Sequence, residues 1–340
     1  MTHVARLRSR ARRRAGHLAG LTAASMLLTL AGPTASAHAA PAAPTAEAAD
    51  ITDGLALWYK LDATSGGTAT DASGNGRNGT VSGTADWSAS GQGLAFNGSD
   101  TYIKVPDDVM KGMNAITVSM DVLIDSAQST PYFLYGFGNT SAGTGNGYLF
   151  TTGNSFRTSV ATGNWSTEQT TKPSDSHNLT RGVWKHVTYA QTGSTGVLYE
   201  DGVEVGRNTS VTTTPGAIGS GSTKANYIGK SVYDGDKLFK GRIRDFRVYD
   251  RALDGSEVEQ LSLPVATQGV ADDKDALSLG DTSGITSDLD LPKVGPAGGS
   301  TVSWDSDNPA VVSGTGKVTR PEAGSPDGHA TLTATRRRAP

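Results

Sequence analysis

The sequence predicts an all-β protein, made of a two-sheet jelly-roll sandwich and a second, partial β-sandwich. Many short runs alternate apolar and polar residues, which is typical of strands with one buried face. Glycine is abundant, with 43 residues among 340, and long amphipathic helical patterns are missing. This composition indicates short strands joined by tight turns, and so many strands favour two packed antiparallel sheets.

Residues 1–40 predict a secretory signal peptide. Six arginines are followed by the apolar stretch "LAGLTAASMLLTLAG" and by the small residues "TASAHAA", an order typical of export signals. The apolar part is too short, and too interrupted by Gly, Ser and Thr, to cross a bilayer stably, so we expect no membrane span. Residues 41–50, rich in Pro and Ala, predict a disordered leader. We therefore expect a secreted, extracellular protein.

Charge and cysteine content narrow the possible partners. Residues 1–40 hold six of the 30 basic residues and none of the 33 acidic ones, so the mature chain has a net charge near −9. A nucleic-acid surface needs a positive face, so we expect no nucleic-acid partner. Cysteine is absent, and core burial or a metal must therefore stabilise the fold. We expect a monomer.

A series of strands predicts the first domain over residues 51–263. In "LALWYKL", Leu55–Leu61, every second residue is apolar. The clearest strand is "ITVSMDVLI", Ile116–Ile124, whose apolar residues share one face and whose polar residues lie opposite. The segment "GVLYEDGVEVG" predicts a hairpin, because Asp201 and Gly202 suit the positive φ angles of a type I′ turn.

The segment "FKGRIRDFRVYDRAL" predicts a strand with an irregularity. Ile243 has the opposite parity to Phe246 and Val248, so a regular strand cannot place all three on one face. Either both faces are buried or a bulge lies near Arg244 and Asp245.

A short helix, a linker and a second domain are predicted next. One or two helical turns are expected at "LDGSEVEQL", where Asp254 and Glu257 can form a capping box. Residues 264–271 are predicted as a linker. Residues 272–340 predict a truncated Ig-like sandwich, because such a domain needs about 100 residues and this segment stops one strand early.

The motifs of the first domain resemble the laminin-G-like, concanavalin A-like jelly roll of secreted bacterial proteins. They are "LALWYKLD", "DASGNGRNGT", "LAFNGSDTYIKVP", "GVWKHVTYAQ" and the closing "GRIRDFRVYDRALDGSEVEQL". The later "STVSWDSDNPAVVS" and "GKVTRP" are similar to a bacterial Ig-like module that often lies between such a jelly roll and a glycoside hydrolase. The resemblance implies a link to enzymes that act on arabinose-containing polysaccharides.

A structural calcium ion is predicted near "DASGNG". The segment places oxygen side chains at alternate positions, as calcium loops do, although an Asx-rich turn explains the same residues. The resemblance favours calcium, since many modules of this type hold one, and it implies that the first and last strands are neighbours. We expect Asp71, Asn75 and Asp245 as ligands. The alternative is an ion pair from Asp245 to Arg242 or Arg247.

Five side chains are predicted to contact a glycan. Trp165 and Trp87 lie in polar, loop-like segments, where an exposed ring can stack on the apolar face of a sugar. The alternative for Trp87 is packing onto the sheet. Arg157, Tyr135 and Tyr233 are weaker candidates for polar or stacking contacts.

No catalytic signature is found, and we assign no catalytic residue. Glycoside hydrolysis needs only two carboxylates, and nothing in the sequence singles out a pair among the 33 acids. We therefore predict a secreted, non-catalytic carbohydrate-binding module, the N-terminal part of a modular polysaccharide-degrading glycoside hydrolase. The alternatives are a glycoside hydrolase in its own right and a cell-surface adhesion module that binds protein.

Overall fold

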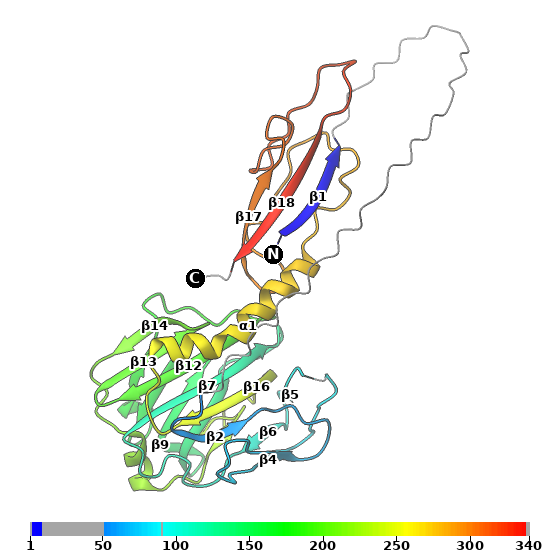
Figure 1. The fold of residues 1–340 in the computed structure, drawn as a ribbon. Coiled ribbons are helices and arrows are strands. Elements are labelled where there is room, and N and C mark those ends of the chain that lie inside the picture. The colour runs from blue at the N-terminus through cyan, green and yellow to red at the C-terminus, as the bar shows by residue number, and fades with distance from the viewer. Residues whose placement is uncertain (1, 9–50, 90, 338–340) are drawn as a thin grey trace. The chain divides into compact units, whose positions relative to one another are not determined.

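The computed structural model describes residues 2–8, 51–89 and 91–337. Most of the predicted signal peptide and all of the predicted leader at 41–50 lie outside these residues. The chain forms two units (Figure 1). The larger contains Ile51–Ser278 and Pro292–Val302, and the smaller contains Leu279–Leu291 and Ser303–Thr335 with an N-terminal strand. No helix in the described ranges has the length and hydropathy needed to cross a membrane.

The larger unit is a sandwich of two antiparallel sheets, which confirms the predicted all-β fold. One sheet has eight strands. In order across the sheet they are β11 (Gln169–Thr171), β10 (Arg157–Ala161), β9 (Thr144–Thr152), β8 (Phe133–Ser141), β15 (Tyr227–Ile228), β6 (Tyr102–Lys104), β4 (Gly79–Ser82) and β3 (Thr68–Ala69).

The other sheet has seven strands. In order they are β14 (Val203–Asn208), β13 (Thr195–Glu200), β12 (Trp184–Thr192), β7 (Ala115–Ile124), β16 (Lys240–Tyr249) and β2 (Leu55–Tyr59), with β5 (Leu94–Asn97) also paired to β16. The predicted turn joins β13 to β14, with φ of 51° at Asp201 and 81° at Gly202. A 3-10 segment, η2 (Pro215–Gly221), lies between β14 and β15.

The main core lies between the two sheets. Strand β7 shows how it is built: Ile116, Val118, Met120, Val122 and Ile124 all point into it and are fully buried, as their alternation predicts. Because successive side chains of a strand point to opposite faces, the intervening polar residues lie on the outer face of the seven-stranded sheet.

The predicted bulge is present in β16. The pairing of β16 with β7 shifts register between Arg244 and Arg247, and Asp245 adopts a left-handed conformation with φ of 50°. The shift changes the parity of the strand, so Ile243, Phe246 and Val248 all reach the main core.

A long helix, α1 (Gly255–Ala276), packs on the outer face of the seven-stranded sheet (Figure 1). Its N-terminus has the predicted capping box of Asp254 and Glu257. The prediction of only one or two helical turns is wrong, because the helix continues through Pro264 and across residues 264–271, which were predicted as the linker. Buried residues at helical spacing, from Val258 to Val265, hold it against the sheet.

The smaller unit has a three-stranded sheet of β1 (Thr2–Arg8), β18 (His329–Arg337) and β17 (Thr301–Ser306). Its core contains Leu291, Val312 and Leu332. Among the described residues, 272–340 supply only two strands of this sheet, and the third comes from residues that the sequence assigned to the signal peptide. In the antiparallel β1–β18 pair, Thr2 lies opposite Thr335.

Candidate functional site

The outer face of the eight-stranded sheet carries a cluster of aromatic and charged side chains, which we call the aromatic face. Alternate residues of β9 and β10 point into the main core and away from it. Leu149 and Val160 belong to the core, whereas Tyr148 and Phe150 belong to a separate outer cluster. The aromatic face consists of Phe133, Tyr148, Phe150, Arg157, Trp165, Glu168 and Tyr233.

The rings of the aromatic face support one another. The centroids of Phe133 and Phe150 are 4.8 Å apart in an edge-to-face contact, and those of Tyr148 and Phe150 are 5.3 Å apart and stacked. Tyr148 meets Tyr233 edge-on at 5.7 Å. Such pairs each contribute about 0.5–1.5 kcal/mol beyond the area that they bury. A rigid aromatic floor results.

Glu168 connects the Tyr148 ring to the guanidinium group of Arg157. One carboxylate oxygen accepts a hydrogen bond from the Tyr148 hydroxyl at 2.8 Å, and the other lies 3.4 Å from Nη1 of Arg157. The Arg157 guanidinium also lies 5.1 Å from the centroid of the Phe150 ring. Burial, together with hydrogen bonds to Tyr233 and Glu168, raises the pKa of Tyr148, which therefore stays a protonated donor.

Trp165 stands at the edge of the aromatic face and is 71% exposed. It begins the short 3-10 helix η1 (Trp165–Thr167), where the Asn164 side chain accepts a hydrogen bond from the backbone N–H of Ser166. The Tyr233 hydroxyl accepts a hydrogen bond from the backbone N–H of Trp165 at 2.9 Å. The loop is thus anchored to the cluster while its indole ring faces solvent.

Three of the five predicted glycan contacts lie together on this face. Tyr233 bonds directly to the Trp165 backbone, and Arg157 joins them through Glu168 and Tyr148. The sequence analysis missed Glu168 and Tyr148. The alternation of "GYLFTT" could have placed Tyr148 on the outer face, but its contact with Glu168 joins residues 20 positions apart.

The other two predicted contacts are wrong as exposed ligand platforms. Trp87 is 7% exposed, belongs to the main core and donates its indole N–H to the carbonyl of Gly66 at 2.9 Å. Tyr135 is fully buried in the same core, where its hydroxyl accepts a hydrogen bond from Thr151. Neither ring offers a face to a ligand.

The Asp71 carboxylate, predicted as a calcium ligand, accepts hydrogen bonds from three backbone N–H groups. One of its carboxylate oxygens accepts backbone N–H groups of Trp58 and Ser73, each at 3.0 Å, and the other accepts that of Arg77 at 2.9 Å. Burial acts to raise the pKa of Asp71, but these hydrogen bonds outweigh it and the pKa lies below its usual value. The Asn75 side chain donates hydrogen bonds from its amide nitrogen to the carbonyl oxygens of Leu55 and Ala56 in β2.

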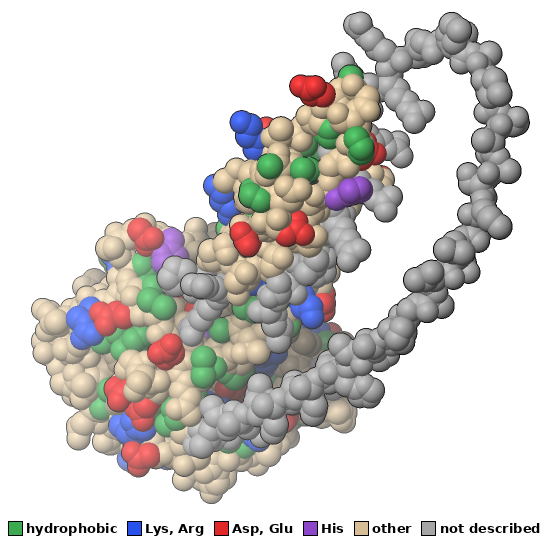
Figure 2. Space-filling model, turned by 45° about the horizontal axis from the view of Figure 1, so that its top comes forward, with side chains coloured by type: hydrophobic (Ala, Val, Ile, Leu, Met, Phe, Trp, Pro, Cys, Tyr) green, Lys and Arg blue, Asp and Glu red, His purple; other side chains and the backbone are tan. Residues whose placement is uncertain are grey.

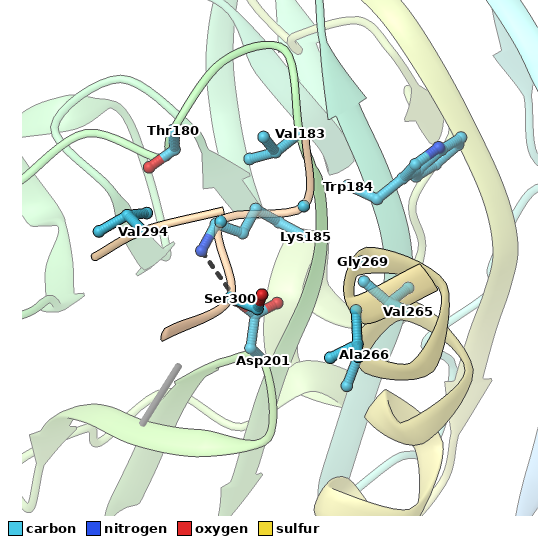
Figure 3. A pocket seen from close by; sticks show the side chains of 13 residues that line it. Thr180, Val183, Trp184, Lys185, Asp201, Val265, Ala266, Gly269, Val294 and Ser300 are labelled. Atoms are coloured by element: carbon cyan, nitrogen blue, oxygen red, sulfur yellow. Dashed lines mark hydrogen bonds and ion pairs between the residues drawn. The ribbon is translucent and has the colours of Figure 1, made fainter. Parts of the chain in front are cut away.

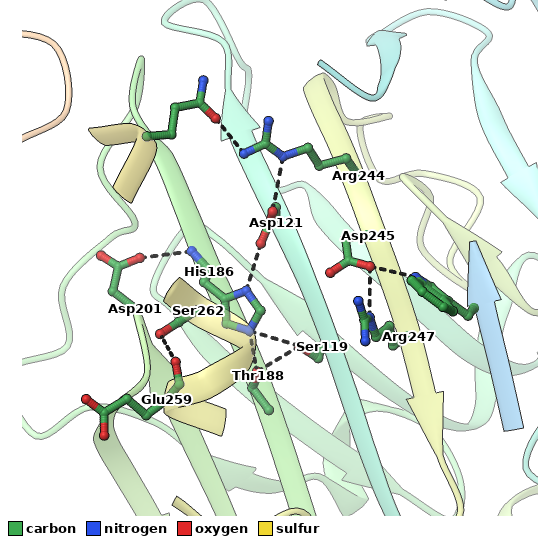
Figure 4. A network of polar contacts seen from close by, with 12 residues as sticks. Ser119, Asp121, His186, Thr188, Asp201, Arg244, Asp245, Arg247, Glu259 and Ser262 are labelled. Carbon is green, nitrogen blue, oxygen red and sulfur yellow. Dashed lines mark hydrogen bonds and ion pairs between the residues drawn. The ribbon is translucent and has the colours of Figure 1, made fainter. Parts of the chain in front are cut away.

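Asp245 has the ion-pair partner that was the alternative to calcium. Its carboxylate accepts hydrogen bonds from Nε of Arg247 at 2.8 Å and from the indole N–H of Trp58 at 2.6 Å (Figure 4). The Arg247 guanidinium lies over the same indole, 4.1 Å from its centroid. The described residues contain no group of three or more acidic or histidine side chains arranged for a metal.

A second polar network lies on the outer face of the seven-stranded sheet. His186 contacts the Asp121 carboxylate at 2.7 Å through Nδ1 and the Ser119 hydroxyl at 3.0 Å through Nε2 (Figure 4). Nε of Arg244 donates to the other Asp121 oxygen at 3.1 Å. Ser119, Asp121 and His186 are all at most 3% exposed. The order Ser–His–Asp suits nucleophilic catalysis, but here no substrate can reach the serine.

Comparisons with protein families assign two segments of the chain. Residues 97–259 match the concanavalin A-like lectin/glucanases superfamily. Residues 270–339 match the atrophied bacterial Ig domain. The family resemblance of both segments, and the incomplete nature of the second, are thereby confirmed. All seven residues of the aromatic face lie inside the concanavalin A-like match. No curated protein matches the chain.

Two solved structures illustrate what this chain is similar to. Domain 4 of AbnA, an extracellular GH43 arabinanase from Geobacillus stearothermophilus in complex with arabinotriose, is 23% identical, and the match covers 61% of this chain and 98% of that one, with a TM-score of 0.49. Trypanosoma rangeli sialidase in complex with 2,3-difluorosialic acid is 19% identical, with 62% and 33% covered and a TM-score of 0.46. These values are too low to carry a function across.

The aromatic face combines the groups that sugar recognition needs. An indole ring can stack on the C–H face of a sugar, while a nearby guanidinium and a phenol can hydrogen-bond its hydroxyl groups. On the face of the larger unit seen in Figure 2, acidic and basic side chains are intermixed.

Proposed function

We propose that this chain is a secreted, non-catalytic carbohydrate-binding module whose ligand lies on the aromatic face. The observation that carries the proposal is the exposed Trp165 ring, anchored by Tyr233 to a buried aromatic floor. An exposed tryptophan costs solvation, and a ring held in place loses little entropy when a ligand stacks on it. The superfamily match, described by its lectins and glucanases, supports a carbohydrate ligand.

The finer assignment follows from the order of the two modules. The resemblance of the two modules implies an arrangement that often precedes a glycoside hydrolase, commonly one that acts on arabinose-containing polysaccharides. We propose that this chain is the front part of such an enzyme. Arabinotriose, arabinan and arabinoxylan are accordingly the first ligands to test.

Binding without turnover is the decisive measurement. Calorimetry of the purified chain with arabinotriose should show saturable binding, and incubation with arabinan, arabinoxylan and β-glucan should release no reducing sugar. Reproducible release of reducing sugar would favour a hydrolase instead. Glycan-array binding that free sugar does not compete would favour an adhesion module.

The Trp165→Ala variant locates the binding site. One stacked aromatic ring is worth about 1 kcal/mol, which corresponds to roughly fivefold in affinity. The variant should lose that affinity and keep its melting temperature, because the side chain is 71% exposed. Leu263→Ala, which removes a 44% exposed side chain from α1, is the matched control and should change neither quantity. Unchanged affinity in Trp165→Ala would place the ligand elsewhere.

A further inference from the structure

A second group of aromatic and basic side chains lies on the outer face of the eight-stranded sheet, beside the aromatic face. In β6, Ile103 belongs to the main core, so its neighbour Tyr102 points to the outer face. In β15, Ile228 and Tyr227 are arranged in the same way. Tyr227 also packs against the outer cluster that contains Tyr148, so the two groups of rings are continuous.

Lys230 places its ammonium group over both of these rings. Its Nζ atom lies 5.0 Å from the ring centroid of Tyr102 and 4.8 Å from that of Tyr227, and the two rings meet edge-to-face at 5.5 Å. The segment that carries Lys230 lies directly on β8, because a side chain at Gly136 would meet the Lys230 carbonyl oxygen at 3.3 Å. The backbone therefore holds the cation on the outer face of the sheet.

The charge of Lys230 is not neutralised by a contact with an acidic residue. Among the residues that the structure describes, no carboxylate oxygen lies within 4.0 Å of its Nζ atom. Ring quadrupoles attract an ammonium group but leave its charge in place. Lys104 differs, because its Nζ atom lies 2.8 Å from the Asp107 carboxylate.

The cavity beside α1 shows the opposite arrangement (Figure 3). Lys185 in its wall lies 2.8 Å from the Asp201 carboxylate and 2.9 Å from that of Glu200. The charged groups of that cavity pair with one another and select no ligand. Lys230, in contrast, is half-buried and keeps its hydrogen-bond donors for a ligand.

A sugar that carries a carboxylate fits these groups. An ammonium group forms its strongest hydrogen bonds with an ionised acceptor, about twice as strong as those between neutral groups. The half-buried rings of Tyr102 and Tyr227 offer an apolar surface to the C–H groups of a sugar. A small inorganic anion could use the ammonium group but would leave the rings unused.

We infer that this surface binds an acidic polysaccharide, with a uronic acid residue at Lys230 and another sugar of the same chain at Trp165. The inference rests on the proposed function, because it extends the ligand of the aromatic face. Tyr148 lies on β9 and Tyr227 on β15, two strands apart in the sheet. Two strand spacings amount to about 10 Å, so a chain of several sugars is needed to reach both groups.

Acidic side chains near the site oppose an anion, and they provide a test of charge. Burial is the main reason that the pKa of Tyr227 is raised, and the nearby Asp234 and Asp107 add to it. Lys104 pairs with Asp107, whereas Asp234 is exposed. Charges farther away than about 8 Å are largely screened at physiological ionic strength, so the excess of acidic residues in the whole chain matters little.

Calorimetry of the full chain with matched polysaccharides tests the inference. The probes are a glucuronic acid-bearing arabinoxylan and a galacturonate-bearing pectic arabinan, each in its acidic form and after reduction of its carboxyl groups. At least one acidic form should bind about tenfold more tightly than its reduced form, the value of one charge-assisted hydrogen bond. Trp165→Ala should weaken the binding of both forms.

Two variants assign the preference to the site. Lys230→Met keeps the apolar stem and removes the charge, so the acidic form should then bind only as tightly as the reduced one. Lys60→Met is the matched control, because Lys60 lies 4.5 Å from the Trp58 ring on the other sheet, and it should change neither affinity. Asp234→Asn should strengthen binding of the acidic form about twofold and leave the reduced form unchanged. Thermal melting establishes that each variant is folded.

The outcomes separate this inference from the proposed function. Equal affinity for acidic and reduced forms, lost in Trp165→Ala, would overturn the inference and leave the proposed function intact. No binding of any glycan would overturn both. A preference for the acidic form that survives Lys230→Met, or competition by acetate as strong as that by free galacturonate, would also overturn the inference.

Discussion

The two sheets of the larger unit share one core, but side chains on their outer faces differ in exposure to solvent. On the seven-stranded sheet, α1 covers Ser119, Asp121 and His186 and leaves them at most 3% exposed. On the eight-stranded sheet the rings of Tyr148 and Phe150 are buried as well, but Trp165 at their edge remains 71% exposed. The first face holds a polar network closed to solvent, and the second exposes one large aromatic ring. Solvent exposure therefore decides which of the two outer faces is available to a ligand.

The buried network should be the more costly of the two to disturb. Asp121→Ala leaves His186 and Arg244 without their shared carboxylate, so we expect the free energy of unfolding to fall by about 3–5 kcal/mol. Denaturation in urea measures it. Asp107→Ala is the matched control: its pair with Lys104 is exposed and is worth about 0–1 kcal/mol. Equal losses of unfolding free energy in the two variants would mean that burial under α1 does not increase the cost of removing a carboxylate.

Trp87 and Trp165, both predicted to lie in loops, allow buried and exposed positions to be compared for one residue type. Trp87→Ala removes a core side chain and should cost about 3 kcal/mol or somewhat more, whereas Trp165→Ala should change stability by less than about 0.5 kcal/mol. Urea denaturation of both variants decides. A large loss of stability in Trp165→Ala would show that its ring is part of the fold rather than a binding surface.

The sequence predicted the features that depend on local pattern. The parity of Ile243 against Phe246 and Val248 was enough to predict the bulge, and Asp254 with Glu257 was enough to predict the helix start. Both signals lie within a few residues of the feature that they describe.

The features that it missed depend on distant partners. Trp87 has polar neighbours in sequence but bonds to Gly66, and Glu168 meets Tyr148 from 20 positions away. The helix passes through Pro264 because the sheet beneath α1 offers an apolar surface, which outweighs the hydrogen bond that proline cannot donate. Tertiary contacts of this kind leave no local pattern.

The hydrogen bonds of the aromatic face should contribute less to stability than its ring contacts do. Tyr148→Phe keeps the ring and removes the hydroxyl that joins Glu168 to Tyr233, so we expect a loss of about 1 kcal/mol in stability. Glycan affinity should fall as well, because Glu168 then keeps only Arg157 to hold it. Calorimetry and urea denaturation measure the two effects. Stability unchanged within error would mean that water replaces the hydroxyl.

A half-buried histidine should give the larger unit a small dependence on pH. His177 contacts Asp175 at 2.7 Å and Glu200 at 2.8 Å. Burial acts to lower its pKa, but the two carboxylates outweigh it, so the pKa lies above its usual value of 6.5. Its contribution is therefore fully present below pH 6.5 and is lost as the pH rises through the raised folded-state value.

The size of this effect should be below about 1 kcal/mol, since solvent screens the pairs. Free energies of unfolding at a series of pH values between 5 and 9, for the native chain and for His177→Gln, isolate it. The difference between the two proteins should shrink as the pH rises. A difference that is constant over the whole range would show that His177 stays in one charge state.

Added calcium should have the smallest effect on stability of all these changes. The carboxylates of Asp71 and Asp245 already have hydrogen-bond donors, so the geometry predicts equal melting temperatures in EDTA and in excess calcium. Asp71→Ala should lower the melting temperature equally in both solutions, because it removes three backbone hydrogen bonds that do not depend on a metal. A melting temperature that rises in calcium, and does so only while Asp71 and Asp245 are both present, would restore the calcium site that the sequence predicted. It would also mean that Arg247 leaves Asp245 when the ion binds, and that an ion pair and a metal site are alternative states of one bulge.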